Sequence, residues 1–458
     1  MVYPSPYRAA MSSLGYQWVL EQLANEGLSV ERVVLPDDPS EWKRLRTCPV
    51  SLETHTPLSR FPILTVSLAY ELEIAGLIDL LEMAGIPPLR EDRRDTDPVI
   101  VLGGPLTFSN PLPVAPFVDV ILLGEAEDTA PIAVSAFFDR ACRASWLDEV
   151  AKLPGAFLPE RDGSTLPPVA KASDTRLPAR SHILAPDAEL SDMFLIEGER
   201  GCHRQCSFCV MRRTTNGGMR LVSPERVLSI IPEEARKVGL VGAAISDHPK
   251  LVEILDVLVK SGKQVSLSSL RADRIERRPA IAELLRASGA RTLTVASDGA
   301  SAQLRRDILK GTVERHLLRT GEIAGGLGFD VFKVYMMVGL PNETEVDIDE
   351  LIRFTLELRK VTGRTRVALG IAPFVAKRNT PMDGTPYAGI KVVNRSLKRL
   401  TRGLRGKVEV RPTSARWAWV EYVVAQGGLE AGMAILDAFH EGATFADYRR
   451  AFVAHGLA

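Results

Sequence analysis

Strand-like and helical segments alternate along the second half of the chain, and this alternation constrains the fold more than any other feature. Between residues 193 and 373 it repeats about every 30 residues, the length of one βα unit. Such segments pack as parallel strands with helices on the faces of the sheet. Six units are present, too few to close an eight-stranded barrel. In barrels of this kind the chemistry collects at the carboxyl ends of the strands.

The predicted elements of this region follow one another as strand and helix. The strands are residues 193–197, 240–245, 264–268, 291–296, 330–338 and 366–372. The helices are residues 224–237, 250–261, 279–288, 301–325 and 345–361. A mainly helical tail follows, with helices predicted over 391–404 and 428–441 and with Trp417 and Trp419 in a strand-like alternation between them.

The first half of the chain also alternates between strands and helices. Apolar or β-branched runs lie at 30–35, 63–67, 99–102 and 118–123, and the last two end in glycine. They indicate an open, mostly parallel α/β sheet of the Rossmann type. The predicted domains are a Rossmann-like domain (1–155), a proline-rich linker (156–190), a barrel (191–387) and a small, mainly helical subdomain (388–458).

Composition restricts the classes of function. The 458 residues include 57 Lys and Arg against 57 Asp and Glu, so no net charge draws in nucleic acid. Hydrophobic residues make up 45% and charged residues 25%, as in soluble globular proteins. No apolar run reaches the roughly 20 residues of a membrane span, and the amino terminus lacks the pattern of a signal peptide. Together with clustered free thiols, these features predict a cytoplasmic protein.

Three of the five cysteines, Cys202, Cys206 and Cys209, lie within eight residues in a C-x3-C-x2-C spacing. A loop with this spacing can turn all three thiolates toward one point. Three thiolate ligands on a cubane iron–sulfur cluster leave one iron open to bind a small molecule. A zinc site that adds His203 is the alternative, but zinc ligands usually come as two close pairs and no second pair exists. Otherwise His203 and Arg204 are expected to be exposed loop residues.

This loop, with Phe208 directly before its last cysteine, resembles the cluster loop of radical S-adenosylmethionine (SAM) enzymes. The resemblance implies a 4Fe–4S cluster on the three cysteines, whose open iron binds the amino and carboxylate groups of SAM. It also implies reductive cleavage of SAM to a 5′-deoxyadenosyl radical, and an open six-unit barrel of the TIM type. The loop follows the first predicted strand, where the barrel rule places the chemistry. Phe208 would shield the cluster edge and stack near adenine, or simply pack within the loop.

The resemblance also implies SAM-binding roles for residues that follow the other strands. After the second strand, Asp247 is the one acid near the place where many relatives carry a Gly-Gly-Glu that meets the SAM ammonium. Ser268 ends the third strand, where a hydroxyl could bond to ribose or carboxylate. After the fourth strand, either Ser297 or Asp298 would be the ribose-binding residue.

Two further segments complete the resemblance. Residues 304–311 match the helix that brings an arginine toward the SAM carboxylate, so Arg305 and Arg306 are candidates. A guanidinium suits this role because it binds a carboxylate through two hydrogen bonds. The alternative is a pair of solvated charges on a helix face. Gly339 opens the segment Gly-Leu-Pro-Asn-Glu-Thr, whose backbone packs beside adenine in the family. The sequence identifies no catalytic residue.

The amino-terminal domain resembles the cobalamin-binding type of domain that precedes many radical SAM barrels. The resemblance rests on its layout and on residues 103–105 (Gly-Gly-Pro) and 124–127 (Gly-Glu-Ala-Glu). The Asp-x-His-x-x-Gly motif, whose histidine binds cobalt in such domains, is missing, and His55 is the only histidine in the first 150 residues. Three outcomes stay open: cobalamin bound without a protein histidine, a domain that has lost cobalamin, or a platform for the substrate.

The leading hypothesis is a radical SAM enzyme that acts on a small-molecule or peptide substrate with an external one-electron reductant of the flavodoxin or ferredoxin type. Cobalamin-dependent methyl transfer is one branch of it. An RNA-modifying enzyme is an alternative, although the best basic patch, residues 398–407, is more simply a solvated helix face. A non-catalytic iron–sulfur electron carrier or sensor is the other alternative. No membrane partner is expected, and the substrate is not identified.

Overall fold

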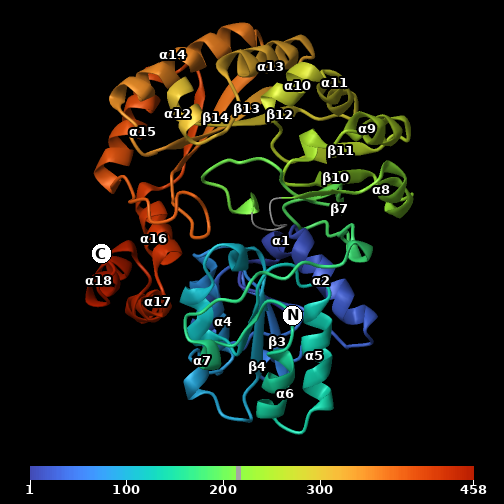
Figure 1. Ribbon diagram of the computed structural model, residues 1–458, viewed down its shortest axis with the longest axis vertical. Coiled ribbons are helices and arrows are strands. Elements are labelled where there is room, and N and C mark those ends of the chain that lie inside the picture. Colours follow the sequence, from blue (N-terminus) through green and yellow to red (C-terminus); the bar gives the residue numbers. More distant parts are fainter. Residues whose placement is uncertain (213–217) are drawn as a thin grey trace. The chain divides into compact units, whose positions relative to one another are not determined.

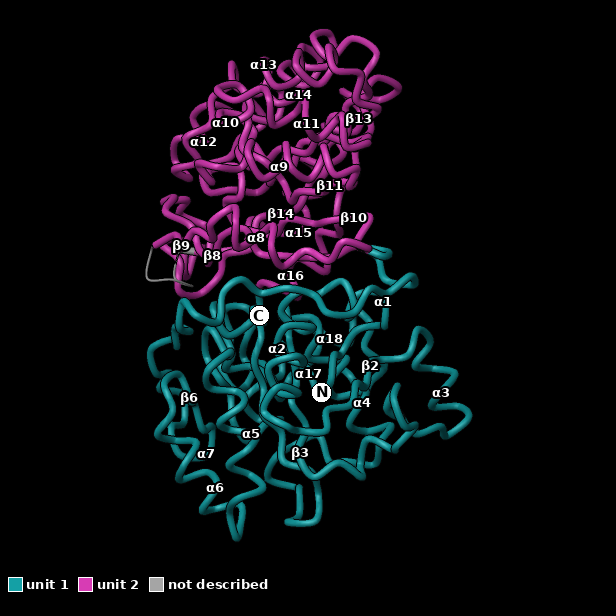
Figure 2. Tube along the Cα trace, turned by 90° about the vertical axis from the view of Figure 1, so that its right-hand side faces the viewer, with its two compact units in different colours: residues 1–192, 423–458 teal, residues 193–422 magenta. Residues whose placement is uncertain are grey.

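The computed structural model describes residues 1–212 and 218–458. These residues divide into two compact units, which Figure 2 shows in different colours. Unit 1 combines residues 1–192 with residues 423–458, and unit 2 is the continuous segment 193–422. The tail predicted as one subdomain, 388–458, is therefore divided, because its first part belongs to unit 2 and its last part to unit 1.

Unit 1 is built on a six-stranded sheet in the order β2-β1-β3-β4-β5-β6. All neighbouring strands are parallel except β5 and β6. The strands are β1 (Val2–Tyr3), β2 (Val33–Val34), β3 (Ile63–Ser67), β4 (Val99–Gly103), β5 (Val120–Leu122) and β6 (Ala156–Phe157). The order reverses at β1, since the chain passes first to β2 on one side and later to β3 on the other. This reversal is the topological switch point of the sheet, where α/β proteins bind ligands.

Helices pack against this sheet, and Figure 1 shows α4 and α5 on either side of β3 and β4. The helices are α1 (Tyr7–Ala10), α2 (Leu14–Asn25), α3 (Pro39–Leu45), α4 (Glu73–Met83), α5 (Thr129–Asp139), α6 (Arg143–Val150), α7 (Pro159–Asp162), α17 (Leu429–Glu441) and α18 (Phe445–Ala454). Ser13 caps α2, as the sequence predicts, by accepting a hydrogen bond from the backbone N–H of Tyr16 at 3.4 Å. Helix α17 approaches the backbone closely at Gly432, where a Cβ would lie 2.1 Å from the carbonyl oxygen of Pro113.

Unit 2 contains a three-stranded and a four-stranded parallel sheet. The first has the order β11-β10-β7, and the second has the order β12-β13-β14-β15. Their strands are β7 (Met193–Glu197), β10 (Lys237–Val241), β11 (Gln264–Leu267), β12 (Thr292–Asp298), β13 (Val331–Val338), β14 (Arg366–Pro373) and β15 (Glu409–Pro412). A parallel bridge between Leu270 and Val295 joins the two sheets. The strands thus follow one another from β7 to β15 in an open barrel, to which β15 adds a strand that was not predicted.

The helices of unit 2 lie outside the curved sheet (Figure 1). They are α8 (Pro224–Ile230), α9 (Leu251–Lys260), α10 (Ala272–Arg277), α11 (Ala280–Ala287), α12 (Ala302–Asp307), α13 (Glu314–Gly326), α14 (Glu345–Val361) and α15 (Ile390–Leu404). Helix α16 (Ala415–Gln426) begins in unit 2, and its last residues belong to unit 1. Buried and exposed side chains alternate along the strands that these helices cover. Phe332 and Val334 of β13 are fully buried, whereas Tyr335 is 40% exposed. Among the described residues, no helix is both long and apolar enough to span a membrane.

Two elements of the barrel differ from their predicted bounds for local reasons. Strand β10 begins at Lys237, and not at residue 240, because helix α8 ends at Ile230. The residue before a proline avoids the helical conformation, and Ile231, which precedes Pro232, has φ −69° and ψ 119°. The predicted helix 301–325 is broken into α12 and α13, since Leu309 between them has a left-handed φ of 54°.

The prediction that Trp417 and Trp419 lie in a strand-like alternation is wrong. Both belong to helix α16. The buried residues Ala415, Ala418 and Ala425 recur at helical spacing, and Trp417 is 41% exposed on another side.

Candidate functional site

The cysteine loop lies at the carboxyl end of β7, the first strand of the barrel, as the sequence predicts. After β7 the chain forms β8 (Glu199–Gly201), which pairs antiparallel with β9 (Met219–Leu221). All three cysteines lie between these two strands, so a short ladder fixes both ends of the loop. Residues 213–217, which belong to the same loop, lie outside the described part of the chain.

Two contacts hold the body of the cysteine loop. Arg204 binds Asp247 through two hydrogen bonds, from Nε at 2.8 Å and from Nη2 at 2.7 Å. The backbone N–H of Ser207 donates to the carbonyl oxygen of Ile308 at 3.1 Å. The expectation of an exposed Arg204 is therefore wrong, because its side chain is 26% exposed and anchors the loop. His203, with 46% of its side chain exposed, agrees with its expectation.

The three thiols are partly buried. Burial raises the pKa of the Cys202 thiol and raises that of Cys209 to about 11. The thiol of Cys206 adds to both shifts because neighbouring thiolates repel each other. The backbone N–H of Arg204 donates to Sγ of Cys202 at 3.4 Å. A metal centre binds the thiolate form, so its positive charge would offset these penalties.

The donor set fits an iron–sulfur cluster better than a single ion. Within residues 1–212 and 218–458, no three His, Cys, Asp or Glu side chains converge as they would on one metal ion. A cubane cluster presents a separate iron to each thiolate, so its ligands stand farther apart than those of a single ion. Soft thiols are also the donors that such clusters use. The assignment of Cys202, Cys206 and Cys209 as cluster ligands stays a prediction that these features support.

Phe208 packs against the hydrophobic core of unit 2. This placement agrees with the simpler expectation for the residue, which is packing within the loop. Together with the bond from Ser207, it keeps the second half of the cysteine loop close to the barrel. The predicted stacking of Phe208 near adenine stays a prediction.

Asp247 is fully engaged by arginines. It lies in the short 3-10 turn Ile245–Asp247, where Arg204 and Arg274 both bind its carboxylate. Burial alone would raise the pKa of Asp247, but the hydrogen bonds from the two arginines outweigh burial and lower the pKa to about 2. Asp247 is thus an ionised anchor for the cysteine loop, and its charge is already balanced.

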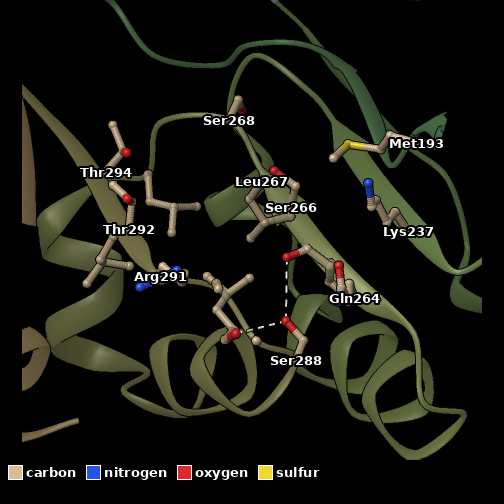
Figure 3. A pocket seen from close by; sticks show the side chains of 16 residues that line it. Met193, Lys237, Gln264, Ser266, Leu267, Ser268, Ser288, Arg291, Thr292 and Thr294 are labelled. Carbon is tan, nitrogen blue, oxygen red and sulfur yellow. Dashed lines mark hydrogen bonds between the residues drawn. The ribbon is translucent and has the colours of Figure 1, made fainter. Parts of the chain in front are cut away.

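A cavity of about 300 Å³ lies along the seam between β11 and β12, where the two sheets separate. Figure 3 shows Ser266, Ser268, Thr292 and Thr294 around it. Ser268 is exposed, and its hydroxyl donates to the carbonyl oxygen of Gly242 at 3.3 Å. Ser268 therefore borders one end of a cavity that extends along β11 to the amino ends of the strands, and its role toward SAM stays a prediction.

After the fourth strand, the two candidates for the ribose-binding residue differ in burial. Ser297 is fully buried, and its hydroxyl lies 3.4 Å from the carbonyl oxygen of Gly299. Asp298 has a left-handed φ of 61° and forms an ion pair with Lys310. The charge of Lys310 also acts to lower the pKa of Cys209, so this lysine lies near the cysteine loop. Asp298 is therefore the better placed candidate.

The two predicted arginines of helix α12 have different surroundings. Arg305 is only 2% exposed, its guanidinium lies 6.0 Å from the centre of the Phe354 ring, and Nη1 donates to Gly299 at 3.3 Å. Arg306 is exposed. Both border a cavity of about 450 Å³ that also meets Gln205 of the cysteine loop. Their role toward the SAM carboxylate stays a prediction, and the sequence analysis missed Lys310 in the same segment.

Gly339 lies directly after β13, in a turn that Glu343 closes. Gly339 has a left-handed φ of 81°, and its N–H donates to Oε1 of Glu343 at 2.8 Å. The other carboxylate oxygen of Glu343 is buried and has no hydrogen-bond partner in the part of the chain that the structure describes. Burial raises the pKa of Glu343 to about 7. The turn is thus formed by the predicted segment itself, and its contact with adenine stays a prediction.

Glu199, which the sequence analysis missed, is a second acid of this kind. It lies in β8 at the start of the cysteine loop and is fully buried. Its Oε1 accepts a hydrogen bond from the N–H of Ala244 at 2.6 Å, and its Oε2 is buried without a partner among the described residues. Burial raises the pKa of Glu199 to about 7. A Cβ on Gly242 would lie 2.4 Å from Oε1, so glycine at the end of β10 makes room for the carboxylate.

In unit 1, Glu73 bridges the two sides of the switch point. Its Oε1 accepts from Ser5 Oγ at 2.9 Å after β1, and its Oε2 accepts from the N–H of Ala69 at 2.6 Å after β3. At Gly76, a Cβ would lie 2.3 Å from the carbonyl oxygen of Pro4, so α4 packs closely on the first loop. The strand-end loops, none of which contains histidine, are residues 4–6, 68–72, 104–105 and 123–125. A corrin bound there would receive no histidine ligand from these loops.

The chain combines an open parallel barrel, which has a three-cysteine loop after its first strand, with a parallel sheet that has a switch point. This combination defines a class of two-unit α/β iron–sulfur enzymes. Residues 196–355 match the radical SAM superfamily, and residues 15–159 match the amino-terminal region of radical SAM proteins. The chain belongs to the radical SAM superfamily and is a radical SAM enzyme. The resemblance and the α/β fold class predicted from the sequence are confirmed.

Known proteins resemble most of the chain. MJ0966, an uncharacterised protein of Methanocaldococcus jannaschii, is 26% identical over 432 residues, which cover 89% of this chain and 85% of that protein. The radical SAM methyltransferase TsrM from Kitasatospora setae, solved with cobalamin and a 4Fe–4S cluster, is similar with a TM-score of 0.58 at 15% identity, covering 86% of this chain and 77% of that one. The cobalamin-dependent radical SAM enzyme OxsB has a TM-score of 0.51 at 14% identity, covering 74% of this chain and 49% of that one. At these identities the two solved structures show the shared fold.

Proposed function

We propose that this protein is a cobalamin-dependent radical SAM enzyme that methylates a small-molecule or peptide substrate. The observation that carries the proposal is the three-cysteine loop at the mouth of a barrel, in a chain whose fold follows a methyltransferase solved with both cofactors. That methyltransferase has also been solved with tryptophan as substrate and a SAM analogue. An amino acid or a peptide is therefore the substrate class to test first.

The cluster would be held by Cys202, Cys206 and Cys209, and when bound there it would supply electron-transfer chemistry for the cleavage of SAM. The chain itself contributes a fixed loop, because Arg204 is tied to Asp247 and Ser207 to the end of α12. The cation of Lys310 near Cys209 favours the thiolate state that a cluster requires. An external flavodoxin- or ferredoxin-type protein would deliver the electron, and a cytoplasmic setting suits that partner.

SAM would lie across the carboxyl ends of the barrel strands. Asp298 is the ribose-binding candidate that the geometry favours over Ser297, and the turn at Gly339 is the adenine-side segment. Asp247 acts on the cysteine loop instead of on SAM, because two arginines already balance its charge. The other candidates for contact with SAM are Phe208, Ser268, Arg305 and Arg306.

Cobalamin would bind at the switch point of unit 1, the edge at which α/β sheets bind their ligands. When bound, cobalamin would supply a cobalt ion that can carry a methyl group. The loops at that edge offer no histidine, so the proposal is cobalamin without a histidine ligand from these loops. Of the three outcomes open from the sequence, this one follows from the likeness to an enzyme solved with cobalamin.

The proposal is tested by anaerobic purification from cobalamin-fed cells, reconstitution with iron and sulfide, and assays of iron, cobalamin and SAM cleavage. Wild-type protein should show the broad cluster absorbance near ~400 nm and cleave SAM when reduced. Cys206→Ala should lose the absorbance and the cleavage but keep cobalamin, because the thiol lies in unit 2.

Cys142→Ala is the matched control, since Cys142 is an exposed free thiol of unit 1. It should keep the cluster, cobalamin and SAM cleavage. Wild-type protein that takes up no iron under these conditions contradicts the radical SAM proposal. Protein with a full cluster and no cobalamin leaves radical SAM chemistry in place and contradicts the cobalamin branch.

A further inference from the structure

The cavity of about 450 Å³ beside the cysteine loop contains buried donors that the chain does not pair. Arg305 and Thr312 border this cavity, and each residue is only 2% exposed. Nε of Arg305 and the hydroxyl of Thr312 have no hydrogen-bond partner among the residues that the structure describes. A buried polar atom without a partner costs folding free energy. Two such atoms at one cavity indicate that a group from outside the chain accepts their hydrogen bonds.

The charge at this cavity is positive and is not balanced there. Within residues 1–212 and 218–458, Arg305 forms no ion pair, and Arg306, which also borders the cavity, is exposed. Glu314 and Glu350 act on the charge of Arg305. Both of these acids are already bound by Arg353, each at 2.7 Å. None of the described residues that border the cavity is an acid, so the group that fits is a carboxylate, which an arginine binds through charge-assisted hydrogen bonds.

Apolar side chains form the rim of this cavity. Leu309 is 54% exposed and Val313 is 49% exposed, and both border the cavity. Leu309 has a left-handed φ of 54°, so the chain accepts backbone strain at an exposed apolar residue. Apolar surface around a buried polar contact is typical of protein–protein hot spots, because the rim excludes water from the contact. A protein that carries a carboxylate therefore fits this site better than a free anion, which would leave the rim in water.

The cavity lies against the loop that carries the three cysteines. Gln205, the residue before Cys206, borders the cavity and is exposed. The next part of the loop is tied to the end of α12, because the N–H of Ser207 donates to the carbonyl oxygen of Ile308 at 3.1 Å. A protein docked on the rim would therefore contact the cysteine loop at Gln205, close to a cluster held by that loop.

We propose that this cavity and its rim form the docking site of an acidic one-electron donor protein. A carboxylate of the donor protein enters the cavity and accepts hydrogen bonds from Arg305 and Thr312, and the apolar surface around it covers Leu309 and Val313. One electron leaves the reduced centre of the donor protein and reduces the cluster, so the donor is oxidised by one electron and no bond forms or breaks. This inference rests on the proposed function, because it requires a cluster on the three cysteines. It gives Arg305 a partner other than SAM.

The test is the rate at which reduced flavodoxin, an acidic protein, reduces the cluster of the holoenzyme, followed by the loss of absorbance near ~400 nm. Val313→Asp places a negative charge on the rim and removes an apolar contact. The fold should accept it, because residue 313 is the N-cap of α13, where aspartate is favoured. At low ionic strength this variant should lower the second-order rate constant about tenfold, and added salt should reduce that factor.

Val346→Asp is the matched control, because Val346 is 75% exposed in the first turn of α14 and does not border the cavity. It should change the rate constant less than about twofold. Val313→Lys separates charge from the lost apolar contact, and it should lower the rate constant less than Val313→Asp does. Dithionite, a small reductant that needs no docking site, should reduce the cluster of every variant within about threefold of the wild-type rate and support the same SAM cleavage.

Equal losses in Val313→Asp and Val313→Lys overturn the acidic partner. An equal loss with dithionite overturns the docking site, since the substitution would then act on the cluster or on bound SAM. Thermal unfolding shows whether Val313→Asp is folded. If it is not, Leu309→Asn replaces it, because asparagine tolerates the left-handed conformation, and it should lower the flavodoxin rate about threefold.

The wild-type enzyme provides the last two outcomes. A cluster that dithionite reduces but that neither reduced flavodoxin nor reduced ferredoxin reduces overturns the docking site. Protein that takes up no cluster, or that does not cleave SAM with dithionite, instead contradicts the proposed function.

Discussion

Each unit of this protein brings the carboxyl ends of parallel strands together at one edge, and Glu73 at the first edge differs from Glu199 and Glu343 at the second in how its carboxylate is hydrogen-bonded. At the switch point of unit 1, both oxygens of Glu73 accept hydrogen bonds from the loops they join. At the mouth of the barrel in unit 2, Glu199 and Glu343 each have one oxygen bonded and one that is buried without a partner within residues 1–212 and 218–458. Burial raises the pKa of both to about 7. A strand-end position shows where a site can form. The hydrogen bonds of the acid at that position show whether it joins two loops, as Glu73 does, or has an oxygen available for another donor, as Glu199 does.

The largest expected effect comes from Asp247, an acid of the barrel mouth that arginines pair through both of its oxygens. Asp247→Ala removes the acceptor shared by Arg204 and Arg274, whose side chains are 26% and 24% exposed while that of Asp247 is 1% exposed. Breaking a buried pair costs about 3–5 kcal/mol when the partner charge stays buried. Because both arginines reach solvent, we expect a loss of about 3 kcal/mol in the free energy of unfolding. Urea denaturation measures this loss, and iron analysis should show lower cluster content because the loop loses its anchor.

Asp349→Ala provides the control for this variant. Asp349 also receives two hydrogen bonds from one arginine, Arg399, but 53% of its side chain is exposed. Solvent screens an exposed pair of this kind, so Asp349→Ala should lower the free energy of unfolding much less than Asp247→Ala does. Equal losses in the two variants would show that Asp247 is an ordinary surface partner and would remove it from the description of the cysteine loop.

Acids whose pKa is raised by burial should make the free energy of unfolding depend on pH in a defined direction. Burial raises the pKa of Glu343 from its usual 4.5 to about 7 in the folded protein. Between these values the folded state holds a proton that the unfolded state releases, so stability falls as pH rises through this window and levels off above it. The contribution of Glu343 is at most about 3 kcal/mol. Glu343→Gln, which carries no titrating proton, should lack it.

Urea denaturation of wild-type protein and Glu343→Gln at pH 5 and pH 7.5 measures this contribution. Relative to wild-type protein, the variant should be more stable at the higher pH than at the lower one. A difference that does not change with pH would show that Glu343 is solvated in the folded protein, and the contrast between the two edges would then rest on Glu199 alone.

The smallest expected change in the free energy of unfolding tests the comparison of the two edges most directly, because a Glu→Gln substitution is made at each edge. Without SAM, Glu73→Gln should lower the free energy of unfolding by about 1 kcal/mol, since it replaces a carboxylate that accepts two hydrogen bonds. Glu199→Gln should cost less than about 0.5 kcal/mol, because one bond survives and a buried charge is removed. Urea denaturation of both variants gives the ranking. The reverse order would mean that the free oxygen of Glu199 is satisfied in the folded protein without a ligand.

The sequence predicts the elements that have a strong periodicity. It misses strands that form only because they pair with strands distant in the chain. Strands β3 and β7 and helix α14 have the predicted bounds because their apolar patterns are long and end at clear boundaries. Strand β1 has two residues and carries no periodic signal. Strand β15 is mostly exposed, and only its pairing with β14 makes it a strand.

The same limit applies to the site. The three cysteines are visible because their spacing is local. The sequence does not reveal the different roles of Glu199 and Glu197. The alternation of side chains along the strand does not show which of the two carboxylates packs against Ala244 and Gly242. Likewise, residues 304–311 contain three cationic side chains. Lys310 is the one that forms an ion pair with Asp298, because it follows the left-handed turn at Leu309.

The discontinuity of unit 1 has a consequence for how the protein is made. Ribosomes deliver residues 1–192 first, but the helices that complete this unit, α17 and α18, belong to residues 423–458. Until they emerge, the carbonyl of Pro113 lacks the helix that packs on it at Gly432. The barrel segment, residues 193–422, is synthesised in between and is continuous. During translation, residues 193–422 are therefore available to fold before unit 1 has all of its residues.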